Sequence, residues 1–423
     1  MTSATAPAES RQDIKVLGLI STGHLLSHYY YLTLPPLFVF INADLDLSFT
    51  ELGVMMTLLY GVAGVVQVPV GFLVDRVGAR IVLTGGLLIM SVGFGLVGLA
   101  PALGQGLMTL GLPFDPTYGI ILAFLTMAAA GHSVFHPADY AILNSSINPQ
   151  RMARAFSIHT FSGHLGSAIA PATILFLAGL TNWKVALMIA GALGVVTMFA
   201  MTSQWNSLHD DVLPGKKKSD GKGGETNGGN SQAGIRLLLS RPMLLFFLFF
   251  AALTMMSSGV HSFLVVGLVG LEVAPLELAG TALSAYLFAS AAGILLGGEI
   301  SDRTERHDLV AMVAFVITAA VMLSVVWARP GAVVLIAVMI LAGLVQGIIR
   351  PARDMMVRAA SPKGSTGKVF GFVSAGIAAG GAISPTVFGL FMDAGNPAWV
   401  FYLMAIFMGI ALFSVAMPKP RHQ

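Results

Sequence analysis

Long apolar runs separated by short polar segments dominate the chain. A helix needs about 20 apolar residues to cross a bilayer, and strands of a membrane barrel are far shorter. Runs of suitable length fall at residues 15–41, 51–73, 81–101, 118–143, 152–178, 183–203, 242–268, 278–299, 309–328, 331–354, 368–392 and 397–417. The pattern predicts an all-α integral membrane protein with twelve transmembrane helices in two six-helix bundles, at 15–203 and 242–417.

The polar segments complete this predicted organisation. Residues 1–14 and 418–423 are predicted to be tails, the first of them disordered. Residues 204–241 contain three consecutive lysines and a run rich in Gly, Ser and Asn. Such a segment is too polar to bury a core, so it predicts a flexible linker between the bundles.

The basic residues predict an orientation, because cytoplasmic loops of membrane proteins carry an excess of Lys and Arg. With the N-terminus in the cytoplasm, all 23 Lys and Arg residues except Lys184 and Arg329 fall on the cytoplasmic side. Both termini and the linker are therefore predicted to be cytoplasmic.

Composition supports a membrane protein and excludes several other classes. Only 10% of the residues are charged and the mean hydropathy is +0.82, whereas soluble domains carry about 25% charged residues. The net charge of +3 gives no indication of nucleic-acid binding. The absence of Cys excludes disulfides and thiolate metal sites. No nucleophile–base pair, nucleotide-binding loop or HExxH motif is present, so we expect neither an enzyme nor a cofactor.

The two halves match each other at a constant offset. Pro137 and Pro351 are 214 residues apart, and so are Pro171 and Pro385. The same offset relates Gly166 to Gly380, which predicts parallel repeats. Transporters that work by alternating access use such repeats, with a substrate site between them.

A short charged segment, GFLVDRVGAR, lies between the second and third apolar runs. Charged side chains are costly in hydrocarbon, so the segment predicts a turn at the membrane surface. Its glycines are expected to let the two helix ends approach closely. The residues of interest are Gly71, Asp75, Arg76, Gly78 and Arg80, with a weaker copy at Asp302 and Arg303 in the second half.

This charged segment resembles the signature of the major facilitator superfamily, although Ala79 replaces the first of the usual two basic residues. The stretches 24–26, 133–137 and 154–171 are similar to the subgroup of fosmidomycin-resistance-like transporters. The resemblance implies a multi-pass protein of a bacterial inner membrane. It also implies that the charged turn holds the two halves together on the cytoplasmic side in the outward-facing state.

Small residues and prolines mark the fifth and eleventh helices. Gly163, Gly166 and Pro171 resemble the superfamily's antiporter motif, which normally ends in Gly-Pro, whereas Ala170 precedes the proline here. Gly380 and Pro385 have the corresponding places in the second half. Glycine permits close helix packing and proline removes a backbone hydrogen bond. Both a packing role and a role in coupling remain open.

Histidines are the most informative candidate chemistry. Seven of the ten lie inside predicted helices. A helical period places His24, His28 and Tyr31 on one face, and the same spacing relates His132, His136 and Asp139. We expect His24, His28 and His164 near mid-depth of the membrane, and His132, His136, Asp139 and His159 nearer the cytoplasm.

Ionisable residues at such depth mark a substrate pathway or a proton relay, and histidine changes charge near neutral pH. In the second half, Gln346 is a candidate cavity residue. Arg350 is either a ligand for an anionic group or a basic side chain that reaches to the membrane surface. The predicted substrate and proton pathway comprises His24, His28, Tyr31, His132, His136, Asp139, His159, His164, Gln346 and Arg350.

The sequence therefore predicts a monomeric secondary transporter that exports a small organic solute by proton coupling, with the solute, protons and lipid as its partners. It leaves the identity of the solute open. One alternative is a transition-metal carrier that uses the histidine pairs, although no resident metal site is predicted. Another is a sensor of the same shape that transports nothing.

Overall fold

The structure, a computed structural model, describes residues 6–148, 151–208, 238–360 and 366–416, and these ranges contain helices and no strand. The first half comprises α1 (Ala6–Thr33), η1 (Pro35–Leu37), α2 (Phe38–Leu45), α3 (Phe49–Val77), α4 (Ala79–Val97), α5 (Ala100–Thr109), α6 (Thr117–His132), α7 (Phe135–Ser146), α8 (Met152–Leu180), α9 (Trp183–Ser203) and η3 (Trp205–Ser207). The second comprises α11 (Arg241–Gly270), α12 (Leu276–Arg303), α13 (His307–Ala328), α14 (Ala332–Ala360), α15 (Thr366–Asp393) and α16 (Ala398–Ala416).

The twelve-helix prediction is confirmed. Eleven helical segments are long and apolar enough to cross a membrane, with α6 and α7 together forming one of them. The twelfth is α1, which is less apolar because it carries Arg11, Asp13, Lys15 and two histidines. The chain is thus a multi-pass membrane protein with six spans in each half.

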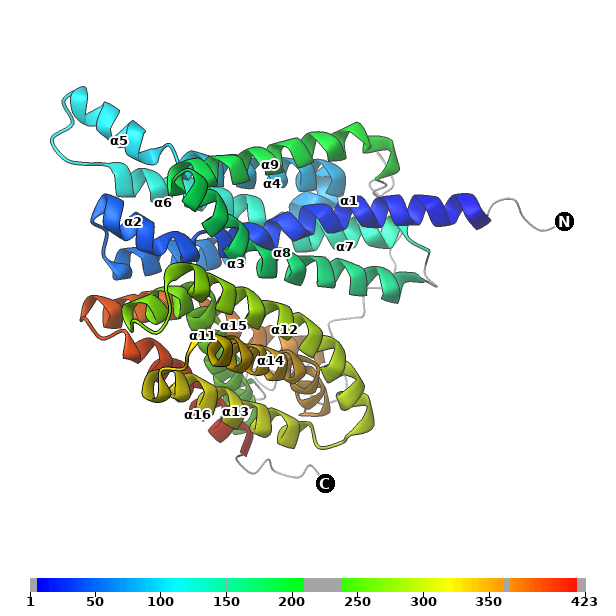
Figure 1. Cartoon of the computed structure of the whole chain (residues 1–423). Helices are drawn as coiled ribbons and strands as arrows, with labels where there is room; N and C mark the ends of the chain where they lie inside the picture. Colours follow the sequence, from blue (N-terminus) through cyan, green and yellow to red (C-terminus); the bar gives the residue numbers. More distant parts are fainter. Residues whose placement is uncertain (1–5, 149–150, 209–237, 361–365, 417–423) are drawn as a thin grey trace.

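The two halves lie side by side (Figure 1). We call the end of the molecule where α9 ends and α11 begins the linker side, and the opposite end, which carries α2 and α5, the far side. Lys184 lies on the far side, where its Nζ is 2.8 Å from Asp44 Oδ2. This hydrogen bond lowers the pKa of Asp44. The exposed Arg329 lies at the same end, directly after α13.

The prediction of a disordered tail over 1–14 is wrong for its described part, since α1 already begins at Ala6. Contacts with the rest of the first half hold this extension in place. Asp13 Oδ2 lies 2.7 Å from Arg151 Nη1, and Gln12 donates a hydrogen bond to the carbonyl of Ser207. The tail segments 1–5 and 418–423 and most of the predicted linker, 209–237, lie outside the described residues.

Two predicted runs are interrupted, and one helix was not predicted. Pro35 and Pro36 lack the N–H that would continue α1, so the first run ends in η1 and α2. The fourth run breaks into α6 and α7 at Ser133 and Val134. The short helix α5 was not predicted and lies on the far side (Figure 1).

The charged segment is mostly helical, which corrects the prediction of a turn spanning all its residues. α3 continues to Val77, and α4 begins two residues later. Gly78, with φ of 102°, makes the reversal alone, because this backbone conformation is readily adopted only by glycine. Gly71 does not mediate close approach, since a Cβ added there would have no atom within 4 Å.

The halves pack tightly on the far side through two related crossings. A Cβ added at Gly53 of α3 would lie 2.4 Å from the carbonyl oxygen of Pro385 of α15. A Cβ added at Gly280 of α12 would lie 2.3 Å from Leu175 of α8 and 4.0 Å from the Pro171 oxygen. Pro385 is the repeat counterpart of Pro171, and Gly280 follows Gly53 by 227 residues, the same separation as that between Asp75 and Asp302 in the two copies of the charged segment. The two crossings are therefore related in the same way as the two halves.

Polar contacts reinforce the α3–α15 crossing. The Asp393 carboxylate accepts hydrogen bonds from the backbone N–H groups of Phe49 and Thr50, at 2.7 and 2.8 Å. These groups belong to the first turn of α3, whose positive helix end favours an anion. The hydroxyls of Thr57 and Thr386 lie 3.0 Å apart. The second half therefore caps a helix of the first.

Nearer the linker side, the halves enclose a cavity of about 810 Å³. Residues of α3, α7, α11, α12, α14 and α15 form its wall. Val68 of α3 lines it and is 69% exposed, and the lining residue Ile377 of α15 is 36% exposed. α3 and α15 therefore pack together on the far side and present exposed faces toward the linker side.

Candidate functional site

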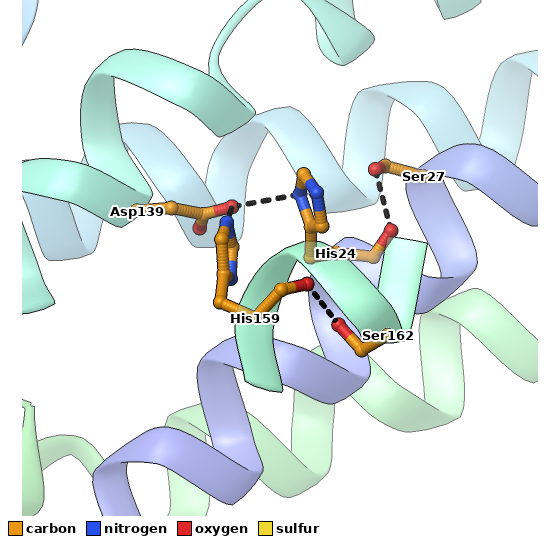
Figure 2. A network of polar contacts seen from close by, with 5 residues as sticks. All are labelled: His24, Ser27, Asp139, His159 and Ser162. Carbon is orange, nitrogen blue, oxygen red and sulfur yellow. Dashed lines mark hydrogen bonds and ion pairs between the residues drawn. The ribbon is translucent and has the colours of Figure 1, made fainter. Parts of the chain in front are cut away.

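The centre of the candidate site is Asp139 of α7, whose side chain is fully buried in the first half. His24 Nδ1 of α1 lies 3.2 Å from its Oδ2, and His159 Nε2 of α8 lies 3.5 Å from the same oxygen. Figure 2 shows both imidazole rings beside the carboxylate. Three helices thus contribute one ionisable side chain each to a single buried cluster.

These close approaches lack hydrogen-bond geometry. His24 Nδ1, both oxygens of Asp139 and both ring nitrogens of His159 have no hydrogen-bond partner among the described residues. The neighbouring Ser27 and Ser162 donate instead to backbone carbonyls of their own helices (Figure 2). A buried carboxylate without hydrogen bonds is costly, so this arrangement needs a proton or another cation to neutralise it.

Further histidines extend the cluster through the first half. The ring centroids of His24 and His159 are 3.9 Å apart, and those of His24 and His28 are 4.7 Å apart. His28 lies 6.2 Å from His132 and 6.5 Å from His164. We call Asp139 and the six histidines the histidine cluster: His24, His28, His132, His136, His159 and His164.

The histidine cluster reaches the cavity at two points. His136 lines the cavity, and its ring lies 5.4 Å from that of His24. His164 Nε2 lies 3.3 Å from Nη1 of Arg350, which lines the cavity from α14 of the second half. The buried carboxylate is therefore connected to the cavity and, through His164, to the other half.

The predicted division of this cluster by depth is wrong. His24 was placed near mid-depth and His159 nearer the linker side, yet their rings are in contact. Likewise, His132 lies against Tyr31, at 4.2 Å between centroids. For His132 and His136, the break between α6 and α7 alters the regular rise on which that prediction depended. The contact between His24 and His159 instead depends on how α1 and α8 pack together.

Glycines of α8 make room for these rings. A Cβ added at Gly163 would lie 2.8 Å from His24 Nε2 and 3.0 Å from His28 Cδ2. A Cβ added at Gly166 would lie 2.0 Å from the carbonyl oxygen of Leu25. The close packing predicted for this motif is present. Whether the motif also sets the direction of coupling stays a prediction.

Comparison with known proteins agrees with this architecture. The family model described as the Major Facilitator Superfamily matches residues 20–276 and 268–423. The chain belongs to the Major Facilitator Superfamily. It is accordingly a membrane transporter of small molecules and not an enzyme.

Two known proteins are similar to the chain in sequence. The chain is 25% identical over 432 residues to the fosmidomycin resistance protein of Escherichia coli, covering 100% of this chain and 97% of the relative. It is 27% identical over 156 residues to an uncharacterized MFS-type transporter of Bacillus subtilis, covering 37% of this chain and 34% of that protein. The first relative matches the predicted subgroup resemblance.

Solved superfamily structures share the fold. A bacterial homologue of the human lysosomal transporter Spinster, in an inward-facing and occupied conformation, has a TM-score of 0.71 at 14% identity, with 95% of each chain covered. The nucleoside transporter NupG has a TM-score of 0.72 at 15% identity, with 95% of this chain and 98% of that chain covered. At such identities the likeness concerns the fold alone.

The two other predicted pathway residues, Gln346 and Tyr31, are held in place by hydrogen bonds. Gln346 is 5% exposed and lines the cavity, and its amide donates to the Thr318 hydroxyl at 3.0 Å. The Tyr31 hydroxyl donates to the carbonyl of Leu59. Gln346 is thus fixed in orientation, and Tyr31 supports the rings of the cluster.

The charged residues of the signature lie apart from the cluster, on the linker side. Arg76, Asp302 and Arg303 are exposed, and Arg303 pairs with Glu299 of its own helix. Arg80 is partly buried, and its guanidinium lies 5.1 Å from the Trp205 ring centroid. The predicted holding together of the two halves concerns the outward-facing state, and the gate role stays a prediction.

Sequence reasoning missed several residues that line the cavity, most of them in the second half. His261 of α11 and Arg353 of α14 face the cavity, as do Tyr286 of α12 and Tyr60 of α3. His261 has no second histidine at helical spacing, so a search for histidine pairs on one helix face did not select it. Its position inside a transmembrane helix is the signal that identifies it.

Proposed function

We propose that this superfamily member exports a small organic solute by alternating access in exchange for protons. The observation that carries the proposal is the buried carboxylate of Asp139 between His24 and His159. Its negative charge has no hydrogen-bond partner among the described residues, so it is balanced only when the site takes up a proton. A proton shared by these three groups neutralises the carboxylate, and its loss restores the charge. Solute binding and proton binding can then favour opposite states of the transporter, as exchange requires.

Protons can reach this cluster from the cavity. The route runs from His136 to His24, over 5.4 Å between centroids, and a second runs from His164 through His28, over 6.5 and 4.7 Å. Proton transfer needs hydrogen-bond contact or one intervening water molecule. We propose that rotation of the rings, or one water molecule between them, completes these contacts along the route.

The direction of the cavity completes the proposal. The basic residues favour an orientation with the linker side and both termini in the cytoplasm of a bacterial cell, and the protein in its inner membrane. The cavity then faces inward, so the solute binds from the cytoplasm. Release on the far side requires separation of the α3–α15 and α8–α12 crossings.

The direct test is substrate-dependent proton movement in proteoliposomes that contain a pH-sensitive dye. Because a relative is a fosmidomycin resistance protein, fosmidomycin is the first compound of the panel. We expect compound-dependent collapse of an imposed pH gradient with wild-type protein. We expect at least a ten-fold slower collapse with His24→Ala, His28→Ala or His164→Ala, since each variant interrupts the route.

The outer-surface substitution Lys184→Gln serves as the control, because Lys184 pairs with Asp44 on the far side, away from the cluster. It should leave the rate unchanged. Solute transport that proceeds at equal rates with and without a pH gradient would contradict proton coupling.

One observation favours a second candidate, a carrier of a transition-metal ion. Ligand atoms of His24, Asp139 and His159 all lie within 4.8 Å of one another. Neighbouring ligand atoms in a tetrahedral zinc site with bonds of about 2.0–2.1 Å lie roughly 3.3 Å apart. The distances of 3.2 and 3.5 Å to Asp139 match this value.

The metal candidate makes its own prediction. Proteoliposomes that contain a zinc-sensitive dye would take up Zn²⁺, and His159→Ala would abolish the uptake. The proton-coupled proposal instead predicts no Zn²⁺ uptake above that of empty liposomes. The near-complete burial of all three side chains favours the proton, because a hydrated metal ion needs a wider entrance.

A further inference from the structure

The cavity between the two halves has an unbalanced set of charges. Its described lining contains two arginines, Arg350 and Arg353, and two histidines, His136 and His261, but no carboxylate. Its volume of about 810 Å³ suits a small organic molecule, since such sites span about 300–1,000 Å³. The wall thus offers positive charge to whatever occupies it.

The two arginines differ in how their charge is balanced. Arg353 Nε lies 2.9 Å from Asp354 Oδ1, and its guanidinium lies 4.7 Å from the ring centroid of Phe250. Arg350 makes no ion pair with any carboxylate in the described part of the chain, and its polar contact is the 3.3 Å approach to His164 Nε2. A guanidinium has five N–H donors, so most of those of Arg350 remain available.

The side chains around Arg350 offer both apolar and polar contacts. Leu253 and Ile377 contribute aliphatic surface, and Tyr60 and Tyr286 contribute rings. Ser258 also lines the cavity, and its hydroxyl is buried without a hydrogen-bond partner among the described residues. A ligand with one acidic group and an apolar body would use each of these features.

We propose that the solute is an organic anion whose carboxylate or phosphonate group pairs with Arg350 while its apolar body lies against the tyrosines and aliphatic residues of the cavity. This inference rests on the proposed function for its transport step. An oxyanion can engage a guanidinium through two parallel hydrogen bonds, which an imidazole nitrogen cannot. A cationic solute would meet the guanidinium of Arg350, which forms no ion pair with a carboxylate in the described part of the chain.

The pairing also gives the solute a means to act on the histidine cluster. His164 contacts Arg350 directly. An anion that engages Arg350 partly neutralises the positive charge beside the His164 ring. Solute binding in the second half thereby changes the surroundings of an imidazole in the first.

The test measures binding alone, by saturation-transfer NMR on the full-length protein in phosphatidylcholine nanodiscs. The probes share one ring and differ in charge: benzoate and phenylphosphonate are anions, benzamide is neutral and benzylammonium is a cation. We expect saturation transfer from the wild-type protein to both anions. The transfer to benzamide and benzylammonium should be weaker. Arg350→Gln should weaken anion binding by about ten-fold or more, the scale of one charge-assisted hydrogen bond.

Two further variants sharpen the result. Arg350→Lys keeps the charge without the planar fork, so it should recover part of the affinity and show that loss in Arg350→Gln is not misfolding. Arg306→Gln is the matched control, since Arg306 is exposed on the linker side beside Asp308. It should bind the anions as the wild type does.

The proposal is overturned if neither anion binds the wild type, if benzamide or benzylammonium binds as well as benzoate, or if Arg350→Gln binds the anions normally. These outcomes do not depend on proton movement. Anion binding without proton exchange would reject only the coupling in the proposed function, and proton-coupled transport of a neutral or cationic solute would reject only the anion.

Discussion

Replacing Asp139 by asparagine is expected to abolish solute accumulation driven by a pH gradient, with a rate at least 100-fold below that of the wild type. The side chain keeps its size but can no longer gain or lose a proton. The two adjacent histidines then lack the negative charge that makes a proton favourable at this site. Proteoliposomes with an imposed pH gradient measure the effect.

A second measurement separates loss of coupling from loss of folding. Counterflow exchange of labelled for unlabelled solute needs the two conformational states but no net proton movement. We expect Asp139→Asn to retain it. We also expect the melting temperature not to fall, because the substitution removes a buried charge without hydrogen bonds.

Asp308→Asn is the matched control, since this carboxylate is partly exposed on the linker side and pairs with Arg306. It should leave accumulation and counterflow unchanged. Normal pH-driven accumulation by Asp139→Asn would remove the carboxylate from the coupling mechanism and leave the histidines as the carriers.

Replacing Gly53 by leucine is expected to reduce transport by at least 100-fold through a different cause. The added Cβ would lie 2.4 Å from the Pro385 oxygen and 3.0 Å from the Thr386 Cα. Both atoms belong to the backbone of α15 and cannot rotate away. α3 and α15 would then remain separated on the far side, and the cavity would be accessible from that side.

Crosslinking reports this change directly, because the chain contains no cysteine. In the double variant Thr57→Cys and Thr386→Cys, we expect rapid disulfide formation, since the two native hydroxyls are 3.0 Å apart. Adding Gly53→Leu should prevent it. Gly61→Leu changes the same helix at a position where an added Cβ meets no atom within 4 Å, so it should not prevent disulfide formation. Crosslinking that persists in Gly53→Leu would show that the crossing tolerates the side chain.

The fold was largely predictable from the sequence because membrane-spanning runs are long and local. Hydropathy located the spans, and a capping box formed by Ser48 and Glu51, which is readable in the sequence, begins α3. The interruptions were less predictable. The apolar run continues through the break between α6 and α7, so hydropathy did not show it. The local signal was Pro137 in the first turn of α7, which has no N–H to donate to the carbonyl of Ser133.

The candidate site was predictable in its membership and not in its geometry. Intramembrane ionisable residues are rare, and this criterion selected Asp139 and the histidines around it. Which of them touch depends on how α1, α7 and α8 pack. Gly163 and Gly166 allow α8 to approach α1 closely, so His24 and His159 meet despite their different expected depths.

The repeat offset of 214 residues that pairs Pro137 with Pro351 also pairs His136 with Arg350, and both of these side chains line the cavity. The two equivalent positions thus carry an imidazole, which can gain or lose a proton near neutral pH, and a guanidinium, which stays charged. Under the proposed mechanism, the first half would respond to protons while the second would keep a constant positive charge for the solute.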